Sequence, residues 1–156
     1  MDLAKLLGPA VSAIVRAAVD RPIGAGIVKN PIYPEGRVRV PGRRLTVLTR
    51  SLSRKLAEKV GESLSGIREV EFGGLTEDDW SSAIEGACNT LGKLSPVTAA
   101  DLISLDLEPH RLYREARRLD DARPDRAAFS EPQLMAYERI LRECCWQIAG
   151  VCHSSA

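Results

Sequence analysis

Few side chains in this sequence could carry covalent or metal chemistry. Adjacent cysteines such as Cys144 and Cys145 project about 100° apart on a helix, so sharing one metal ion would be awkward for them. An apolar helical pattern around them favours reduced thiols that fill a core. We therefore expect four free thiols and no metal site. The residues concerned are the cysteines Cys88, Cys144, Cys145 and Cys152 and the histidines His110 and His153.

No known catalytic motif brings these residues together. The sequence contains no phosphate-binding loop, no nucleophile elbow and no zinc-protease helix. His110 follows Pro109 where a helix is expected to begin, so a solvated or capping role is ordinary for it. Glu77, Asp78 and Asp79 form one acidic run at a helix start, where carboxylates favourably meet the helix dipole. We expect no catalytic residue, no cofactor and no enzymatic activity.

The distribution of charge is the informative feature. The 156 residues carry a net charge of only +1, but residues 1–60 hold 12 basic and 4 acidic side chains, a net charge of +8. Residues 61–156 hold the other 10 basic and 17 acidic side chains, a net charge of −7. This division predicts either a basic surface for an acidic partner or a second copy, or two faces of one domain that neutralise each other. The candidate interaction residues are Arg43, Arg44, Arg50, Arg54, Lys55 and Lys59.

The elements that must position these residues are helices. Apolar residues make up 44% of the chain and charged residues 28%, a globular balance. Leucine and valine recur every three or four residues from Leu45 to Leu64, and a similar stripe runs from Trp80 to Leu94. We predict one all-α bundle of five to six helices over residues 1–156. It comprises an N-terminal helix (1–20), a Pro/Gly-rich connector or small hairpin (21–42) and a helical bundle (43–153).

Hydroxyl residues followed by acids or amides mark the expected helix starts. Thr76 with Asp79 and Ser130 with Gln133 have the spacing of a capping box. Thr98 with Asp101 predicts a further start. The Gly73-Gly74 pair predicts a helix end, and the polar, proline-broken segment 120–127 predicts a connector.

The N-terminal apolar run is too short to cross a bilayer. It extends from Leu6 to Val15, whereas a spanning helix needs about 20 residues. The run is preceded by only a weak charged region and is followed by no clear cleavage site, so it lacks the features of a secretory signal. We expect a cytoplasmic protein in which a helix begins or is kinked at Pro9. An amphipathic, membrane-active role for residues 2–19 remains as an alternative.

Two segments resemble a known family. One is Gly74-Leu75-Thr76-Glu77-Asp78-Asp79-Trp80 with the helix that follows through Leu91, and the other is the last helix, Tyr137 to Trp146. Together they resemble the N-terminal helical domains that precede the NTPase module in bacterial NACHT proteins, the prokaryotic relatives of NOD-like immune receptors. The resemblance implies a regulatory, adaptor or effector role in antiphage defence, next to an ATPase module. It supplies no catalytic residue.

The resemblance and the charge division lead to one expected function and two alternatives. We expect an interaction domain that contacts a second copy, the adjoining NACHT module or an effector, and binds no small-molecule substrate. The first alternative is a membrane-active effector that uses residues 2–19. The second is a small nucleic-acid-binding regulator that uses the basic residues 37–59, although few aromatic side chains are available for stacking bases.

Overall fold

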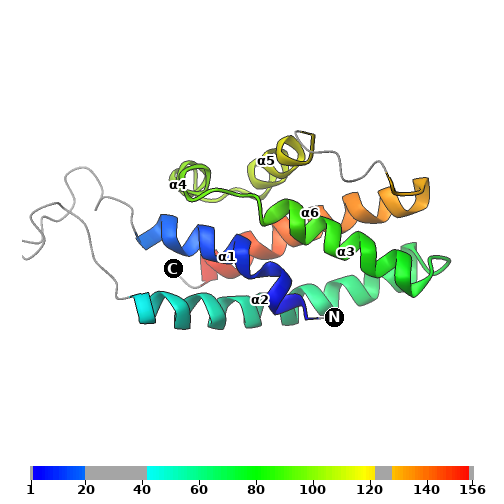
Figure 1. The fold of residues 1–156 in the computed structure, drawn as a ribbon, viewed down its shortest axis with the longest axis horizontal. Helices are drawn as coiled ribbons and strands as arrows, with labels where there is room; N and C mark the ends of the chain where they lie inside the picture. Colours follow the sequence, from blue (N-terminus) through cyan, green and yellow to red (C-terminus); the bar gives the residue numbers. More distant parts are fainter. Residues whose placement is uncertain (1, 20–41, 122–127, 155–156) are drawn as a thin grey trace, which may run out of the picture.

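Helices account for the whole regular structure of the described residues. The computed structural model describes residues 2–19, 42–121 and 128–154, with side chains for residues 2–19, 46–121 and 128–152. These residues form six helices and no strand, which confirms the all-α prediction (Figure 1). The predicted connector or hairpin near 21–42 lies outside the described residues except for Gly42, which begins a helix. The helices are α1 (Leu3–Val19), α2 (Gly42–Glu71), α3 (Glu77–Leu91), α4 (Pro96–Ser104), α5 (Pro109–Asp121) and α6 (Glu131–Ser154).

Helix α1 is packed on several sides. Ala13, Ile14 and Val15 are consecutive and all buried, which one helical face cannot achieve at 100° per residue. Accordingly α1 contacts α2, α3 and α4. The helix begins at Leu3 and runs through Pro9, so a start at Pro9 was the wrong alternative. Gly8 helps to accommodate this proline, because it lacks the Cβ that would crowd the proline ring.

Helix α2 is the longest element and is only partly covered. Leu56, Val60 and Leu64 of the predicted stripe are buried. Leu48 is 42% exposed, so the stripe does not serve as core over its whole length. The reason is visible in Figure 1, where the first turns of α2 extend beyond the end of α6. The helix continues to Glu71, and the predicted break at Gly73-Gly74 is confirmed.

Two of the three predicted helix starts have the expected capping geometry. The backbone N–H of Asp79 donates to Oγ1 of Thr76 at 3.1 Å. At the start of α6 the N–H of Gln133 donates to Oγ of Ser130 at 3.3 Å, and the N–H of Ser130 donates back to Oε1 of Gln133 at 3.4 Å. The capping box of Ser130 and Gln133 is confirmed, and Thr76 is confirmed as the N-cap of α3.

The third start was placed three residues too late. Ser95, not Thr98, caps α4: its Oγ accepts the backbone N–H of Thr98 at 3.1 Å. Pro96 occupies the first helical position, where its fixed φ is already helical and its missing N–H is not needed. This proline makes the preceding hydroxyl the cap.

The connector after α5 also begins later than predicted. Helix α5 starts at Pro109 as expected but continues to Asp121, and Asp120 is buried. The remainder of the predicted connector, residues 122–127, lies outside the described part of the chain.

Helix α6 closes the bundle against three neighbours. It contacts α2, α3 and α5, and both Cys144 and Cys145 are fully buried because the helix is enclosed on more than one side. The hydroxyl of Tyr137 on α6 forms a 2.7 Å hydrogen bond with that of Thr90 on α3. Since each hydroxyl has a partner, the pair crosses the core without leaving either polar group unsatisfied.

Candidate interaction surface

The predicted basic residues lie along the first half of α2. Arg43 and Arg44 occupy its first turns, and their side chains are outside the described part of the structure. The prediction that the basic residues off the leucine stripe are exposed is confirmed for Arg50, Arg54 and Lys59, and Lys55 is exposed as well.

The exposed basic residues form two rows. Arg50 and Arg54 are one turn apart, and Lys55 and Lys59 are one turn apart on a row about 100° farther round the helix. The arginines line a groove between α2 and α1, whereas neither lysine does. We refer to Lys55 and Lys59 as the lysine row. The structure therefore separates the sequence candidates into two surfaces.

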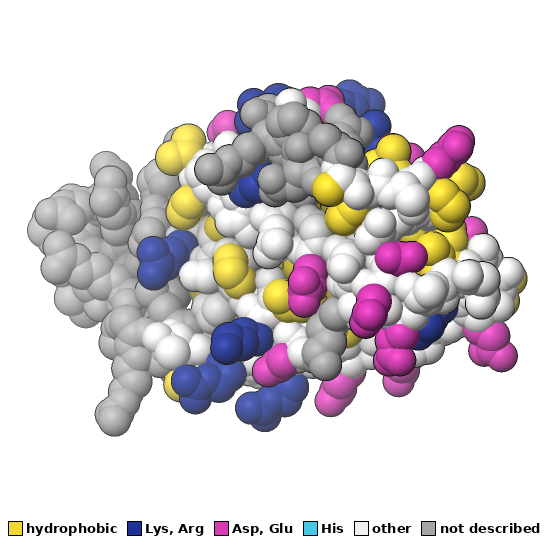
Figure 2. Space-filling view, turned by 45° about the vertical axis from the view of Figure 1, so that its right-hand side comes forward, with side chains coloured by type: hydrophobic (Ala, Val, Ile, Leu, Met, Phe, Trp, Pro, Cys, Tyr) yellow, Lys and Arg dark blue, Asp and Glu magenta, His cyan; other side chains and the backbone are white. Residues whose placement is uncertain are grey.

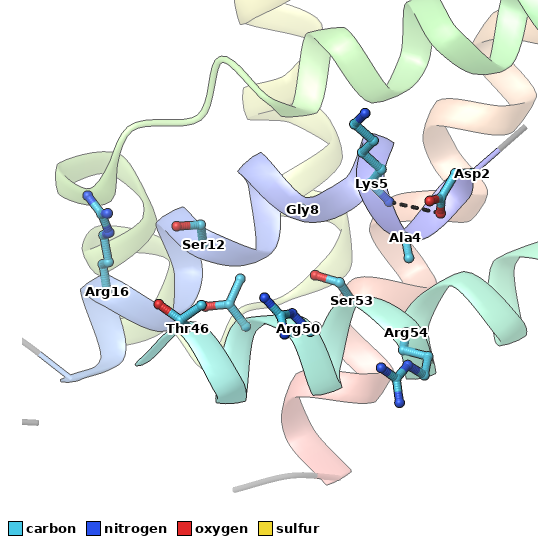
Figure 3. A pocket seen from close by; sticks show the side chains of 11 residues that line it. Asp2, Ala4, Lys5, Gly8, Ser12, Arg16, Thr46, Arg50, Ser53 and Arg54 are labelled. Atoms are coloured by element: carbon cyan, nitrogen blue, oxygen red, sulfur yellow. Dashed lines mark hydrogen bonds between the residues drawn. The ribbon is translucent and has the colours of Figure 1, made fainter. Parts of the chain in front are cut away.

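The groove between α1 and α2 has a volume of about 970 Å³. Small residues four positions apart, Ala4, Gly8 and Ser12, line it from α1, and Thr49 and Ser53 line it from α2. Figure 3 shows Ser53 pointing from α2 toward α1, between the two helices. Small side chains on both helices leave this space open.

Four basic side chains and one carboxylate border the groove. Oδ1 of Asp2 accepts the backbone N–H of Lys5 at 3.3 Å and thereby caps the start of α1. Within the described residues no carboxylate pairs with Lys5, Arg16 or either groove arginine. The described ion pairs lie elsewhere, for example Arg117 with Glu138 at 2.7 Å. The lining residues with ionisable side chains are Asp2, Lys5, Arg16, Arg50 and Arg54.

Ser53 is the unusual residue of the groove. Ser53 is buried, with only 4% of the residue's surface exposed. Its Oγ has no hydrogen-bond partner among the described residues. A buried hydroxyl without a partner is rare in proteins, so an acceptor from outside the chain would satisfy it.

Sequence reasoning did not single out the α1 side of this groove. Lys5 and Arg16 were counted only in the net charge of residues 1–60. The helical pattern of residues 2–19 was defined by its large apolar residues and did not include the small ones. A signal was present: Ala4, Gly8, Ser12 and Arg16 recur every four residues, which places them along one helical face.

The acidic part of the chain lies away from the basic part. Figure 2 shows a group of lysine and arginine side chains at the lower left of the face in view and a group of acidic side chains at its lower right, with both kinds present along the upper edge. Exposed acids occur where α2 ends and α3 begins, at Glu69, Glu71, Glu77 and Asp78. Arg139 on α6 pairs with Glu71 at 3.4 Å.

Direct neutralisation between the two halves is absent from the described residues. None of the basic side chains that the structure describes in residues 1–60 forms an ion pair there. The segregated charges thus remain available on the surface rather than cancelling one another in contacts. These basic residues are Lys5, Arg16, Arg50, Arg54, Lys55 and Lys59.

The thiols have the environment of core residues. Cys88, Cys144 and Cys145 are buried, Cys152 is half-buried, and all four are free. A hydrogen bond with Cys88, together with burial, raises the pKa of Cys144. Burial also raises the pKa of Cys145, and raises that of Cys152 to about 11. Since the thiolate is the nucleophile and the metal ligand, these cysteines are poorly suited to either role.

The described histidine is also structural. His110 is exposed, and its ring meets Trp146 edge-on with centroids 4.7 Å apart. The carboxylate of Glu108 accepts the backbone N–H groups of His110 and Arg111 at the start of α5. These two hydrogen bonds lower the pKa of Glu108, that from His110 more strongly. His153 lies beyond the described side chains.

Among the described residues no three His, Cys, Asp or Glu side chains are grouped to hold a metal ion.

None of the described helices combines the length and the apolar character needed to cross a bilayer. In α1 the apolar residues Leu7 and Val11 are turned into the core, at 0% and 2% exposure.

The fold of the described residues, six helices without a strand, defines the class of the protein as a small all-α domain. Over residues 3–153 the sequence matches the family NACHT N-terminal Helical domain 1. The chain belongs to this family, and the resemblance found in its two segments is confirmed across nearly its whole length. Neither a curated protein nor a solved structure matches the chain.

Proposed function

We propose that this chain is a non-catalytic contact domain of a bacterial NACHT-type immune receptor. It acts in the cytoplasm in antiphage defence and passes the state of a NACHT ATPase module to a partner through protein–protein contact. Family membership supports the association with a NACHT module. The exposed and unpaired basic residues of α2 support the contact role.

The charge arrangement along α2 is the observation that carries the proposal. Its first turn holds no acid, and Glu69 and Glu71 lie near its C-terminus. A helix is stabilised by acids at its N-terminus and bases at its C-terminus, so much of this arrangement opposes the helix dipole. Apart from Arg68 in the last turn, the charges near the ends of α2 therefore do not stabilise the helix through its dipole. Exposed charges without partners are suited to recognising a surface of the opposite sign.

The partner should present an acidic surface. A second copy offers one where α2 ends and α3 begins, and an adjoining NACHT module or an effector could offer another. Each of these contacts would be strengthened by low salt, because exposed charges more than a Debye length apart are screened.

Charge reversal in the intact receptor tests the proposal. Replacing Arg50, Arg54 and Lys59 together by Glu should leave the fold intact, because exposed substitutions usually change stability by about 0.5 kcal/mol or less. The triple variant should keep its melting temperature and lose defence against phage. Because Arg50 and Arg54 also line the groove, the pair Lys55→Glu with Lys59→Glu is tested beside it and should lose defence as well. A matched variant that replaces Glu69, Glu77 and Asp78 by Lys tests the acidic side of a contact between copies.

Three results would contradict the contact role. A triple variant that folds and defends fully would show that this surface is not the interaction surface. Liposome leakage that depends on residues 2–19 would favour a membrane-active effector instead. Salt-dependent binding of duplex or single-stranded DNA to the isolated chain would favour a nucleic-acid regulator.

A further inference from the structure

We infer that the groove between α1 and α2 binds a small soluble molecule that carries at least two phosphate groups. This inference goes beyond the contact role, since it concerns a ligand site on a different side of α2 from the lysine row. The groove is lined by Lys5 and Arg16 of α1 and by Arg50 and Arg54 of α2. The hydroxyl of Ser53, which is buried and has no partner among the described residues, lies between the two helices (Figure 3).

The charge of the groove matches two phosphates. Among the described lining residues, four basic side chains and the carboxylate of Asp2 give a net charge of about +3. A phosphate ester carries about −1.5 to −2 near pH 7, so two such groups neutralise the groove. An acidic peptide would have to place three carboxylates in the same space to do so. Its charge density is therefore the poorer match.

The donors in the groove also suit phosphate. Three guanidinium groups offer planar pairs of N–H donors, which bind phosphate oxygens in a bidentate way. The Ser53 hydroxyl, buried and without a partner, and the Ser12 hydroxyl on the facing helix supply further donors. A phosphate oxygen can accept several hydrogen bonds at once, so one group could satisfy Ser53 and an arginine together.

The remaining lining residues limit the kind of molecule. None of the described residues that line the groove is aromatic, so none of them stacks on a nucleobase. Lys5 and Arg16 lie eleven positions apart on α1, about 16 Å along the helix axis. A volume of about 970 Å³ leaves room for a molecule much larger than one phosphate. The site is thus expected to recognise the spacing of phosphates and not a base.

Calorimetric titration of the full 156-residue chain tests the site with inorganic pyrophosphate and tripolyphosphate, without added divalent cations. Orthophosphate and sulfate serve as single-anion comparisons and should bind more weakly. The double variant Arg16→Gln with Arg50→Gln should weaken pyrophosphate binding about tenfold or more, since it removes two forked donors. The matched variant Lys55→Gln with Lys59→Gln removes the same charge outside the groove and should change binding less than about threefold.

A second variant keeps the test independent of the arginines. Ser12→Glu places a carboxylate among the basic residues, in an open part of the groove, and should abolish pyrophosphate binding without lowering the melting temperature. Ser53→Ala should weaken binding by less than the arginine pair. Both variants keep the lysine row, so loss of phosphate binding and loss of partner binding can be observed separately.

Three outcomes would overturn the inference. They are absence of pyrophosphate binding, equal weakening by the arginine pair and the lysine pair, and full binding by Ser12→Glu. Phosphatidylcholine vesicles with and without phosphatidylinositol bisphosphate distinguish the source of the phosphates. Binding to such vesicles without binding of pyrophosphate or tripolyphosphate would also refute a soluble ligand.

Discussion

Cys144 and Cys145 follow each other along α6, and both are excluded from solvent. Their raised pKa values keep the thiols protonated at neutral pH. We predict that a thiol reagent modifies Cys152 first, because this residue is half-buried, and that the rate rises with pH toward its pKa of about 11. The other three thiols should react only when the protein unfolds. Thiol titration of native and denatured protein measures both steps.

Rapid modification of all four thiols in the native protein would contradict this assignment, as would stoichiometric zinc that is lost when Cys144 and Cys152 are mutated. A structural check uses Cys145→Ser. Burying a hydroxyl there should lower the free energy of unfolding by about 1–3 kcal/mol.

At the scale of single residues, the sequence predicted burial correctly where the helical spacing of apolar residues is enough to determine it. The cysteines sit on or beside apolar positions of a helix, and the structure buries them as that pattern predicts. Ser53 could not be recognised in this way. It lies one position after Leu52, and its burial depends on how closely α1 approaches, which no local pattern in α2 records.

At the scale of the element, Ser95 and Thr98 are the two candidates for the N-cap of α4. Ser95→Ala should lower the free energy of unfolding by about 0.5–2 kcal/mol, because it removes the acceptor for the first N–H groups of α4. Thr98→Ala should cost less, since Thr98 contributes only its Oγ1 contact with Ser95. Chemical denaturation of the two variants measures the difference. The larger loss in Thr98→Ala would show that the cap lies at Thr98.

The contact between α2 and α6 should respond to pH. Burial alone would raise the pKa of Glu143, but hydrogen bonds from Gln147 and Arg139 outweigh it and the pKa is lowered below 4.5. Gln147 also bonds to Ser63 on α2 at 3.1 Å. A carboxylate with a lowered pKa in the folded state stabilises the protein above its unfolded pKa. This stabilisation is lost as the pH falls through the folded value.

Glu143→Gln tests this contribution. The variant should be less stable than the parent at pH 7, and the two should converge in strongly acidic solution, where Glu143 is protonated in both states. Urea unfolding across the acidic range measures the difference. A gap that stays constant with pH would rule out the charge of Glu143 as its cause.

Helix ends were predictable where their signals were unambiguous and were shifted where two signals overlapped. The Thr76 and Ser130 caps each have one candidate hydroxyl. Near α4, Ser95 and Thr98 both fit, and Pro96 decides between them through its backbone geometry. The end of α5 was assigned too early because Asp120 is polar, and a polar local sequence does not predict that this residue is buried.

At the scale of the whole molecule, α1 is a core element. We predict that Leu7→Ala lowers the free energy of unfolding by about 2–5 kcal/mol, because Leu7 is fully buried. Replacing Leu7 by Asp should prevent folding. Thermal denaturation and circular dichroism measure these effects. If Leu7→Asp instead leaves the fold intact and removes only membrane binding, α1 is a membrane element and not part of the core.

The all-α class was predictable because leucine spacing and capping signals agree over most of the chain. The number of sides on which a helix is packed was not, since that depends on the arrangement of all six helices. Residues 13–15 of α1 illustrate this: their sequence is merely apolar, and only the contacts with α2, α3 and α4 bury all of them. The groove has the same origin, because it exists only between two helices.

Binding between this chain and its adjoining NACHT module tests the contact role most directly. The dissociation constant should be measured at several salt concentrations for the parent and for Lys55→Glu with Lys59→Glu, which leaves the groove unchanged. The account predicts that the parent binds more weakly as salt rises. It also predicts that the double reversal weakens binding at low salt about tenfold or more without changing the melting temperature. Equal dissociation constants for the two proteins, unaffected by salt, would contradict it.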